Sequence, residues 1–255
     1  MKLKLTFLGT GTSVGVPMLL SDHPVGDSQD PKDSRLRCSV VIESEETILL
    51  VDCGPDFRMQ LLKNPKPRLD AILFTHEHSD HIAGLDDIRP YCFRQGALDI
   101  YGLKRVLKSL EERYAYIFTK TNRYPGAASV NPIEVKNQNL EIGDLKVIPI
   151  QIAHGNLPIL GYRVGGLAYL TDVKFISDEE LEKLQGLDVL VLSCLRESPH
   201  STHLNLEEAL SLVEKINPKK TYFTHISHLF GMHQEISEKL PKDVYLAYDN
   251  LEIVI

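Results

Sequence analysis

The segment Thr75–His81, with the sequence THEHSDH, gathers three imidazoles and two carboxylates within seven residues. Histidine and aspartate are poor core residues, and a buried charge needs a partner or a metal ion. The spacing His-x-His-x-Asp-His therefore predicts a metal site. If strand geometry persists into the segment, His76 and His78 point the same way and can hold one ion. Asp80 and His81 come after a turn and can face a second ion.

Apolar residues flank this segment on both sides. Leu69–Phe74 is typical of a short strand, and Ile82–Leu85 is typical of the start of a helix or turn. The candidate ligands would therefore lie in a strand-to-helix loop at the carboxyl end of a strand, which is where open α/β sheets place their sites.

Three further histidine and aspartate residues follow predicted strands in the second half of the chain. His154 follows residues 151–153, Asp172 follows residues 168–171, and His225 follows residues 221–224. Each of them alone could be a surface polar residue where a strand stops. Two ions need more ligands than the first motif supplies, so the shared position at strand ends favours a site that includes all three.

Hydrophobic periodicity and turn residues predict many short strands and helices. Strands are expected at residues 2–8, 38–43, 47–52, 69–74, 98–101, 133–135, 145–151, 160–164, 167–171, 189–193, 221–224, 244–248 and 251–255. Helices are expected at residues 55–62, 103–117, 178–184, 206–216 and 233–240. A Gly-rich turn at residues 9–17 lacks the lysine of a P-loop and is interpreted as a tight loop near the site.

The motif His76-x-His78-x-Asp80-His81, with the preceding segment Leu50–Gly54, resembles the metallo-β-lactamase superfamily of metal-dependent hydrolases. The resemblance implies the α/β (α+β) class, with a four-layer αββα sandwich of two mixed β-sheets flanked by helices and a two-metal site at one edge. It assigns one ion to His76, His78 and His154, the other ion to Asp80, His81 and His225, and both ions to Asp172. Water or hydroxide would fill the remaining bridging position.

The resemblance also places Asp52 beneath the site, where its carboxylate would orient a metal-bound histidine. Helix capping is the plainer role for an aspartate before a predicted helix. The expected cofactors are two divalent ions, because imidazoles suit zinc and the two carboxylates admit manganese. Two such ions about 3.5–4 Å apart lower the pKa of a shared water and clamp a phosphoryl oxygen.

Catalysis needs two further roles beyond metal binding. Asp80, besides coordinating, could orient the hydroxide for attack. A leaving alkoxide needs a proton donor, and the candidates are His200 and His203. We expect His203 to be this acid, because it directly precedes a helix that begins with the capping box Asn205-Leu206-Glu207-Glu208.

Several other segments resemble the PhnP-like phosphodiesterase branch of the superfamily, which is related to ribonuclease Z. They are residues 10–17, the His203-x-Asn205 turn, residues 224–228 and residues 247–249. The resemblance implies a small cyclic or linear phosphate diester as substrate, such as a cyclic ribose phosphate or a nucleotide-like compound.

One segment departs from the pattern of this branch. PhnP-like proteins usually carry three cysteines after the Gly-rich loop, which join a later histidine in a structural zinc site. The aligned positions here hold Ser21, His23 and Gly26, and His228 matches the later histidine. Two nitrogen ligands do not make a closed tetrahedral site, so we expect no structural zinc. The loop at residues 19–35 would then be either held by other contacts or mobile.

Length and composition limit the remaining possibilities. The 255 residues, 43% of them hydrophobic, suit a single domain over residues 1–255. Its sequence pattern is less clear at about 91–131, where a helical insert is expected. Aromatic residues in this insert could form a homodimer face or a pocket wall, although ordinary packing is the plainer reading. With 28 basic and 35 acidic residues, the net charge of −7 offers no global field for nucleic acid or an anionic membrane.

The chain shows no signal peptide and no run as long as a membrane span. Its four scattered cysteines, Cys38, Cys53, Cys92 and Cys194, are typical of reduced thiols in a cytoplasmic protein. The expected partner is a small phosphodiester. The alternatives are a tRNA 3′-processing ribonuclease, which would need a long basic arm, a thioester hydrolase, and a non-catalytic metal-binding accessory protein of cofactor biosynthesis.

Overall fold

The computed structural model describes residues 2–119 and 121–255, which form two mixed β-sheets packed face to face. The first sheet has the strand order β15 (Glu252–Val254), β1 (Lys4–Gly9), β2 (Ser39–Glu43), β3 (Ile48–Val51), β4 (Ala71–Leu73), β5 (Leu98–Gly102) and β6 (Val130–Glu134). The strands from β3 to β6 are parallel to one another, and β15, β1 and β2 continue the sheet in antiparallel pairing.

The second sheet has the strand order β11 (Phe175–Ile176), β8 (Leu145–His154), β9 (Leu157–Val164), β10 (Leu167–Leu170), β12 (Val189–Ser193), β13 (Lys220–Thr224) and β14 (Val244–Leu246). A short strand, β7 (Leu140–Ile142), pairs with β8 off this path. Strands β10, β12, β13 and β14 are parallel to one another, β8 and β9 form a long antiparallel hairpin, and β11 pairs antiparallel with β8.

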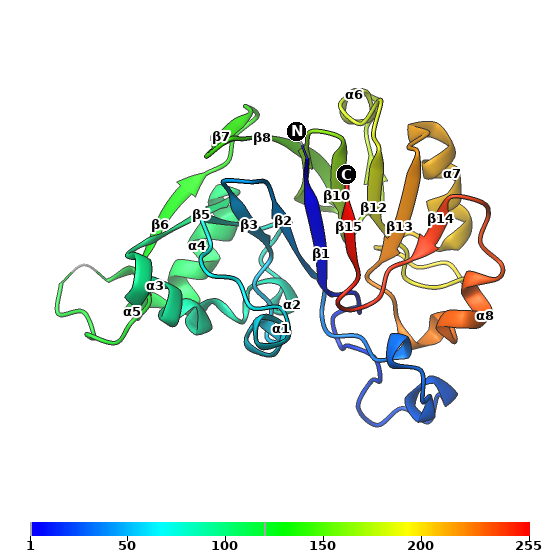
Figure 1. Ribbon diagram of the computed structural model, residues 1–255, viewed down its shortest axis with the longest axis horizontal. Coiled ribbons are helices and arrows are strands. Elements are labelled where there is room, and N and C mark those ends of the chain that lie inside the picture. Colours follow the sequence, from blue (N-terminus) through cyan, green and yellow to red (C-terminus); the bar gives the residue numbers. More distant parts are fainter. Residues whose placement is uncertain (1, 120) are drawn as a thin grey trace.

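Helices cover the outer face of each sheet (Figure 1). The helices against the first sheet are α1 (Phe57–Lys63), α2 (Ser79–Ile82), α3 (Arg89–Gln95), α4 (Lys104–Arg113) and α5 (Ala115–Phe118), with the 3₁₀ turn η3 (Leu85–Ile88). The helices against the second sheet are α6 (Asp178–Glu182), α7 (Leu206–Ile216) and α8 (His233–Ser237), with η4 (His228–Phe230). Two further 3₁₀ turns, η1 (Pro24–Asp27) and η2 (Pro31–Asp33), lie in the loop after β1.

The strands are apolar on both faces because each sheet is buried on both sides. In β3, Leu49 and Val51 belong to the core between the sheets, whereas Ile48 and Leu50 pack under the helices. β12 follows the same alternation, with Val189 and Val191 facing the first sheet and its other apolar side chains facing α7. These three apolar cores confirm the predicted four-layer αββα sandwich.

The structure corrects two of the predicted elements. The helix expected at residues 103–117 is broken at Tyr114, whose backbone leaves helical geometry and whose hydroxyl donates to the Ile82 carbonyl at 3.4 Å. The strand expected at residues 133–135 begins earlier, at Val130, and contains Pro132. This proline is tolerated because β6 is an edge strand, which needs fewer backbone donors.

The loop after β1 is held by contacts with α8, beside which it lies in Figure 1. The Asp33 carboxylate accepts a hydrogen bond from the His233 backbone amide at 2.6 Å, and Arg35 is buried. The rings of His23 and His228 lie 5.7 Å apart, and among the described residues they join no group of three potential metal ligands. The absence of a structural zinc stays a prediction. No helix within residues 2–119 and 121–255 is long and apolar enough to cross a membrane.

Candidate metal centre

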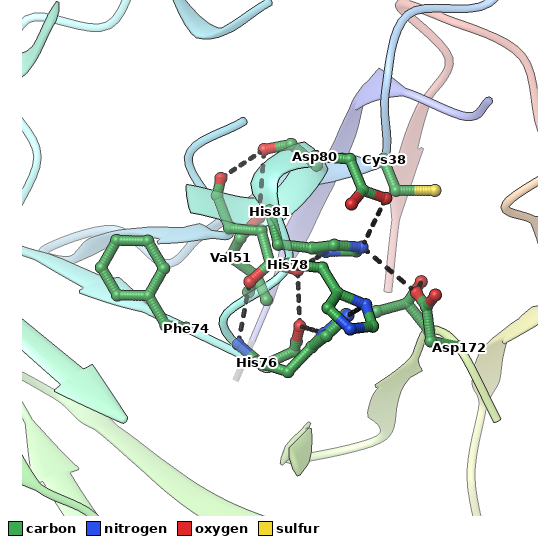
Figure 2. A network of polar contacts seen from close by, with 12 residues as sticks. Cys38, Val51, Phe74, His76, His78, Asp80, His81 and Asp172 are labelled. Carbon is green, nitrogen blue, oxygen red and sulfur yellow. Dashed lines mark hydrogen bonds and ion pairs between the residues drawn. The ribbon is translucent and has the colours of Figure 1, made fainter. Parts of the chain in front are cut away.

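The candidate ligands meet at the edge where parallel strands of both sheets end. His76 follows β4, Asp172 follows β10 and His225 directly follows β13. His154 is the last residue of β8, which continues beyond its predicted end at residue 151. Figure 2 shows the side chains of His76, His78, Asp80, His81 and Asp172 gathered around one point. The structure thus brings together all seven residues that the sequence indicated as ligands.

Three residues at these strand ends have left-handed backbones, which non-glycine residues rarely adopt. The φ angles are 61° for Asp52, 56° for Asp172 and 56° for His225. Each such residue turns the chain sharply at the end of its strand, so the side chain faces the gap between the sheets. Strain of this kind clusters at functional sites, where surrounding contacts maintain it.

One group of imidazoles forms half of the centre. His76, His78 and His154 each offer a nitrogen, and these atoms lie within 4.8 Å of one another. His76 Nε2 is 3.0 Å from His78 Nδ1. His154 Nδ1 donates to the Thr202 carbonyl at 2.9 Å, which leaves Nε2 of that ring without a proton in the neutral form. Three converging lone pairs are the donor set that a zinc ion prefers.

The other half of the centre combines imidazoles with carboxylates. His81 Nε2 lies 3.1 Å from Asp80 and 3.3 Å from Asp172, as the dashed lines in Figure 2 show. His225 Nε2 lies 3.2 Å from the other Asp172 oxygen and 3.7 Å from Asp80. Both Nε2 atoms are buried without hydrogen-bond geometry to any described residue. Buried nitrogens that face carboxylate oxygens in this way fit a shared divalent cation.

Electrostatics within the cluster also favour a cation. Burial alone would raise the pKa of Asp172, but the imidazoles of His225 and His81 outweigh it and hold this pKa well below its ordinary value. Burial would also raise the pKa of Asp80, but His81 and His225 together outweigh it and lower this pKa. Burial lowers the pKa of His76 and, with the charge of His154, that of His78. The two carboxylates are thus ionised and His76 and His78 are neutral, which are the protonation states that bind metals. Burial would lower the pKa of His81, but the surrounding carboxylates outweigh it and hold this pKa well above its ordinary value, so an ion bound there would displace a proton.

Asp52 lies beneath the centre and is fully buried. Its carboxylate accepts hydrogen bonds from His81 Nδ1 at 2.6 Å, and from the Thr75 amide and hydroxyl, both at 2.8 Å. The bond to His81 fixes the tautomer whose Nε2 faces the site, which is the usual task of a carboxylate behind a ligating histidine. The carboxylate caps no backbone amide of α1, so the capping role for Asp52 is wrong.

We expect the substitution Asp52→Asn to weaken metal binding about 10- to 100-fold, because the amide can no longer accept all three bonds and hold the His81 tautomer. Isothermal titration calorimetry with Zn²⁺ or Mn²⁺ measures this change. Asp70→Asn is a matched control, since Asp70 accepts a backbone bond from Ile48 in the same sheet away from the centre. An unchanged affinity in Asp52→Asn would rule out the orienting role.

His203 lies beside the Asp172 carboxylate, which contacts both halves of the centre, and His200 lies on the other side of His203. His203 Nδ1 is 3.7 Å from Asp172, and its ring stacks on that of His225 with centroids 4.9 Å apart. The ring of His200 is 5.1 Å from that of His203, and its Nδ1 accepts from the Thr202 amide. Burial, together with the nearby imidazole of His225, lowers the pKa of His203 to about 3.

The main chain at His203 is held by its neighbours. Lys174 Nζ donates to the His203 carbonyl at 3.3 Å and forms an ion pair with Glu208 at 2.7 Å. Glu208 is also the third residue of α7, where it completes the capping box with Asn205. The predicted cap is therefore confirmed, and it fixes the turn that carries His203.

Sequence reasoning gave no role to three residues that hold the centre in place, namely Thr75, Glu77 and Arg105. Thr75 bonds both Asp52 and His76, and the pair of Glu77 with Arg105 ties the motif to α4 at 2.8 Å. Sequence reasoning also overlooked that His203 forms a fourth potential ligand group with His154 and Asp172. Thr75 adjoins the ligand motif without being one of its ligand positions, and Arg105 lies in a different helix, so neither gave a signal; the position of His203 beside the capping box did.

Comparison with known proteins places this geometry in a family. Residues 47–226 match the family model that is described as the β-lactamase superfamily domain. The chain belongs to the metallo-β-lactamase superfamily. Within it, the crystal structure of a diphosphatase from the PhnP family is 40% identical, covers 100% of this chain and 98% of its own, and superimposes with a TM-score of 0.93. The chain is therefore a PhnP-like member, and a metal-dependent hydrolase by family.

Two curated relatives are named for other activities. An octanoyltransferase of Porphyromonas gingivalis is 40% identical over 99% of this chain and 52% of its own length. A ribonuclease Z of Methanopyrus kandleri is 26% identical over 64% of this chain and 50% of its own length. The chain thus spans about half the length of these two proteins.

Proposed function

We propose that this protein is a phosphodiesterase with a dinuclear metal centre, which hydrolyses a small cyclic or linear phosphate diester. The observation that carries the proposal is the clustering of seven candidate ligands in overlapping groups, in which Asp172 lies against ligands of both halves. His203 lies beside the same carboxylate. The PhnP-family diphosphatase, which spans the whole chain, supports a substrate that contains phosphate. In this proposal His76, His78 and His154 hold one ion, and Asp80, His81 and His225 hold the other.

The bound ions would supply a local positive field and activate water, which suits an anionic substrate on a chain of net charge −7. The protein side chains add orientation and proton transfer. In this proposal Asp80, besides holding an ion, would accept a hydrogen bond from the attacking water. His203 is neutral near pH 7 in the free protein, since its pKa is about 3. An anionic substrate beside this imidazole raises its pKa, so we expect His203 to take up its proton as the substrate binds.

The proposal is tested with a panel of phosphate esters and metal-reconstituted protein. We expect bis(p-nitrophenyl) phosphate and at least one cyclic ribose phosphate to be cleaved in the presence of Mn²⁺ or Zn²⁺. Chelation should abolish the activity, and His76→Ala should not cleave. A nucleoside diphosphate and a tRNA precursor in the panel separate diphosphatase and ribonuclease activities. If metal-loaded protein cleaves no member of the panel, the proposal is wrong.

A second candidate function is the hydrolysis of an octanoyl thioester. It is favoured by the octanoyltransferase that is 40% identical over 99% of this chain. This chain matches only 52% of that protein, and the other half could carry the named activity. Release of free thiol from an octanoyl thioester by metal-loaded protein, without cleavage of the phosphate esters, would favour this second function.

A further inference from the structure

Arg35 is a buried arginine outside the candidate metal centre, in the segment that joins the loop after β1 to β2. It is 4% exposed. Its Nη1 donates to the Thr10 hydroxyl at 2.9 Å and to the Ala247 carbonyl at 2.6 Å, and its Nη2 lies 3.0 Å from His233 Nδ1. Because a guanidinium can only donate, His233 Nδ1 must accept this bond as a neutral imidazole. Three segments distant in sequence are thus joined by one side chain.

The Thr10 hydroxyl links this guanidinium to a buried carboxylate. It accepts from Arg35 and donates to Asp249 Oδ1 at 2.8 Å, so both hydrogen-bonding capacities of the hydroxyl are used. The other Asp249 oxygen accepts from the Leu36 amide at 2.7 Å. Buried charges are retained when they are compensated in this way, and a fully bonded network is rigid. The position of Thr10 is therefore fixed on several sides.

The Thr10 backbone transmits this rigidity to the metal centre. The Thr10 carbonyl accepts from the Ile226 amide at 2.9 Å, and the Ile226 carbonyl accepts from the Thr12 amide at 3.0 Å. Ile226 directly follows the candidate ligand His225, and β13 ends one residue before His225. The strained left-handed residue His225 is thus flanked by β13 on one side and by a residue locked to Thr10 and Thr12 on the other.

The close approach of these segments depends on Gly11. A Cβ atom at this position would lie 2.8 Å from the Arg35 carbonyl, nearer than real side chains approach. The Gly11 amide donates to Leu36 at 2.7 Å, and its carbonyl accepts from the Cys38 amide at 3.1 Å. The Gly-rich turn is interpreted from sequence as a tight loop near the site. Gly11 forms β-bridges with both Arg37 and Ile226, so this turn is held between the Arg35 segment and the residue after His225.

We propose that Arg35, acting through Thr10, is a positioning residue that keeps His225 in its left-handed conformation with Nε2 directed at Asp172. This inference rests on the metal centre of the proposed function, in which His225 is a ligand. It predicts that loss of the Thr10 hydroxyl weakens the half of the centre formed by Asp80, His81 and His225. The half formed by His76, His78 and His154 should keep its affinity, because none of its ligands is bonded to Thr10 or Ile226.

The test compares Thr10→Val, which has the shape of threonine without the hydroxyl, with Thr10→Ser, which keeps the hydroxyl. Zn²⁺ is titrated into metal-free protein by calorimetry, in the wild-type background and in the His225→Ala background. We expect Thr10→Val to weaken one binding event about 10-fold or more, and Thr10→Ser to restore wild-type affinity. In the His225→Ala background Thr10→Val should cause no further loss, because the coupled partner is gone.

Equal affinities of Thr10→Val and Thr10→Ser would overturn the inference, as would an equal loss by Thr10→Val in the His225→Ala background. If Thr10→Val does not fold, Arg35→Lys replaces it, because lysine keeps the charge but cannot reach Thr10, Ala247 and His233 together. Folded Arg35→Lys with wild-type Zn²⁺ affinity and unchanged hydrogen exchange of the Ile226 amide would also overturn it. The readout is metal binding, so absence of phosphodiesterase activity does not affect this test.

Discussion

Alanine in place of Asp172 is expected to reduce metal-dependent hydrolysis about 1,000-fold and to weaken binding in both halves of the centre. The Asp172 carboxylate is buried and lies 3.3 Å from His81 Nε2 and 3.2 Å from His225 Nε2. Charge stabilisation by bound cations contributes several kcal/mol to such reactions, and a loss of about 4 kcal/mol corresponds to about 1,000-fold in rate. Without this carboxylate, imidazoles would face one another across the gap between the sheets.

Metal content by mass spectrometry and turnover of bis(p-nitrophenyl) phosphate are the two measurements. Asp144→Ala serves as the control, because Asp144 is exposed, bonds only the hydroxyls of Ser44 and Thr47 through its side chain among the described residues, and follows β7 rather than a strand that ends at the centre. The control should keep both metal content and activity. If Asp172→Ala retains two ions per chain, Asp172 does not bridge the two halves, and the dinuclear arrangement proposed here is wrong.

The fold and the ligand cluster could be predicted because they depend on local patterns. Short apolar strands that end in histidine or aspartate place these residues at one edge, whatever the loops between them do. His154, Asp172 and His225 come together although more than 50 residues separate Asp172 from His225. Side-chain periodicity and strand ends contain this information, and the resemblance to a known superfamily supplied the order of the layers.

The supports of the centre could not be predicted, because they depend on contacts between distant segments. The Arg35 guanidinium reaches residues on three segments that are distant in sequence, and its sequence context gives no sign of burial. The helix break at Tyr114 likewise follows from a tertiary bond to Ile82, which periodicity cannot reveal. Long-range polar contacts of this kind leave no short-range pattern, whereas ligand motifs and caps do.

The four cysteines also show the difference between what the sequence pattern predicts and what the surrounding structure decides. All four are free and buried, as expected from their scattered positions. Burial raises the pKa of the Cys38 thiol to about 12, so the thiol keeps its proton in the metal-free protein. The hydrogen bond from Cys38 Sγ to the Gly11 carbonyl at 3.2 Å uses this proton. Cys38 belongs to none of the groups of potential metal ligands found among the described residues.

Replacement of His203 by alanine is expected to slow cleavage of a phosphodiester with an alkoxide leaving group about 100- to 10,000-fold, the range for removal of a general acid. Cleavage of bis(p-nitrophenyl) phosphate should change far less, because nitrophenolate leaves readily without a proton. The comparison of a cyclic ribose phosphate with the nitrophenyl ester, at saturating substrate and metal, measures the difference. His200→Ala is the matched control and should retain activity on both substrates, since His200 lies beyond His203 from Asp172.

The leaving-group comparison separates two roles that the geometry allows for His203. Its position near His154 and Asp172 also makes it a potential metal ligand. A lost ligand would slow both substrates equally and lower the metal content, whereas a lost acid slows only the substrate whose leaving group needs a proton. Equal slowing with reduced metal content would therefore exclude His203 as the acid and assign it to the centre. Selective slowing with full metal content supports the acid, because Asp172 then orients an imidazole that binds no ion.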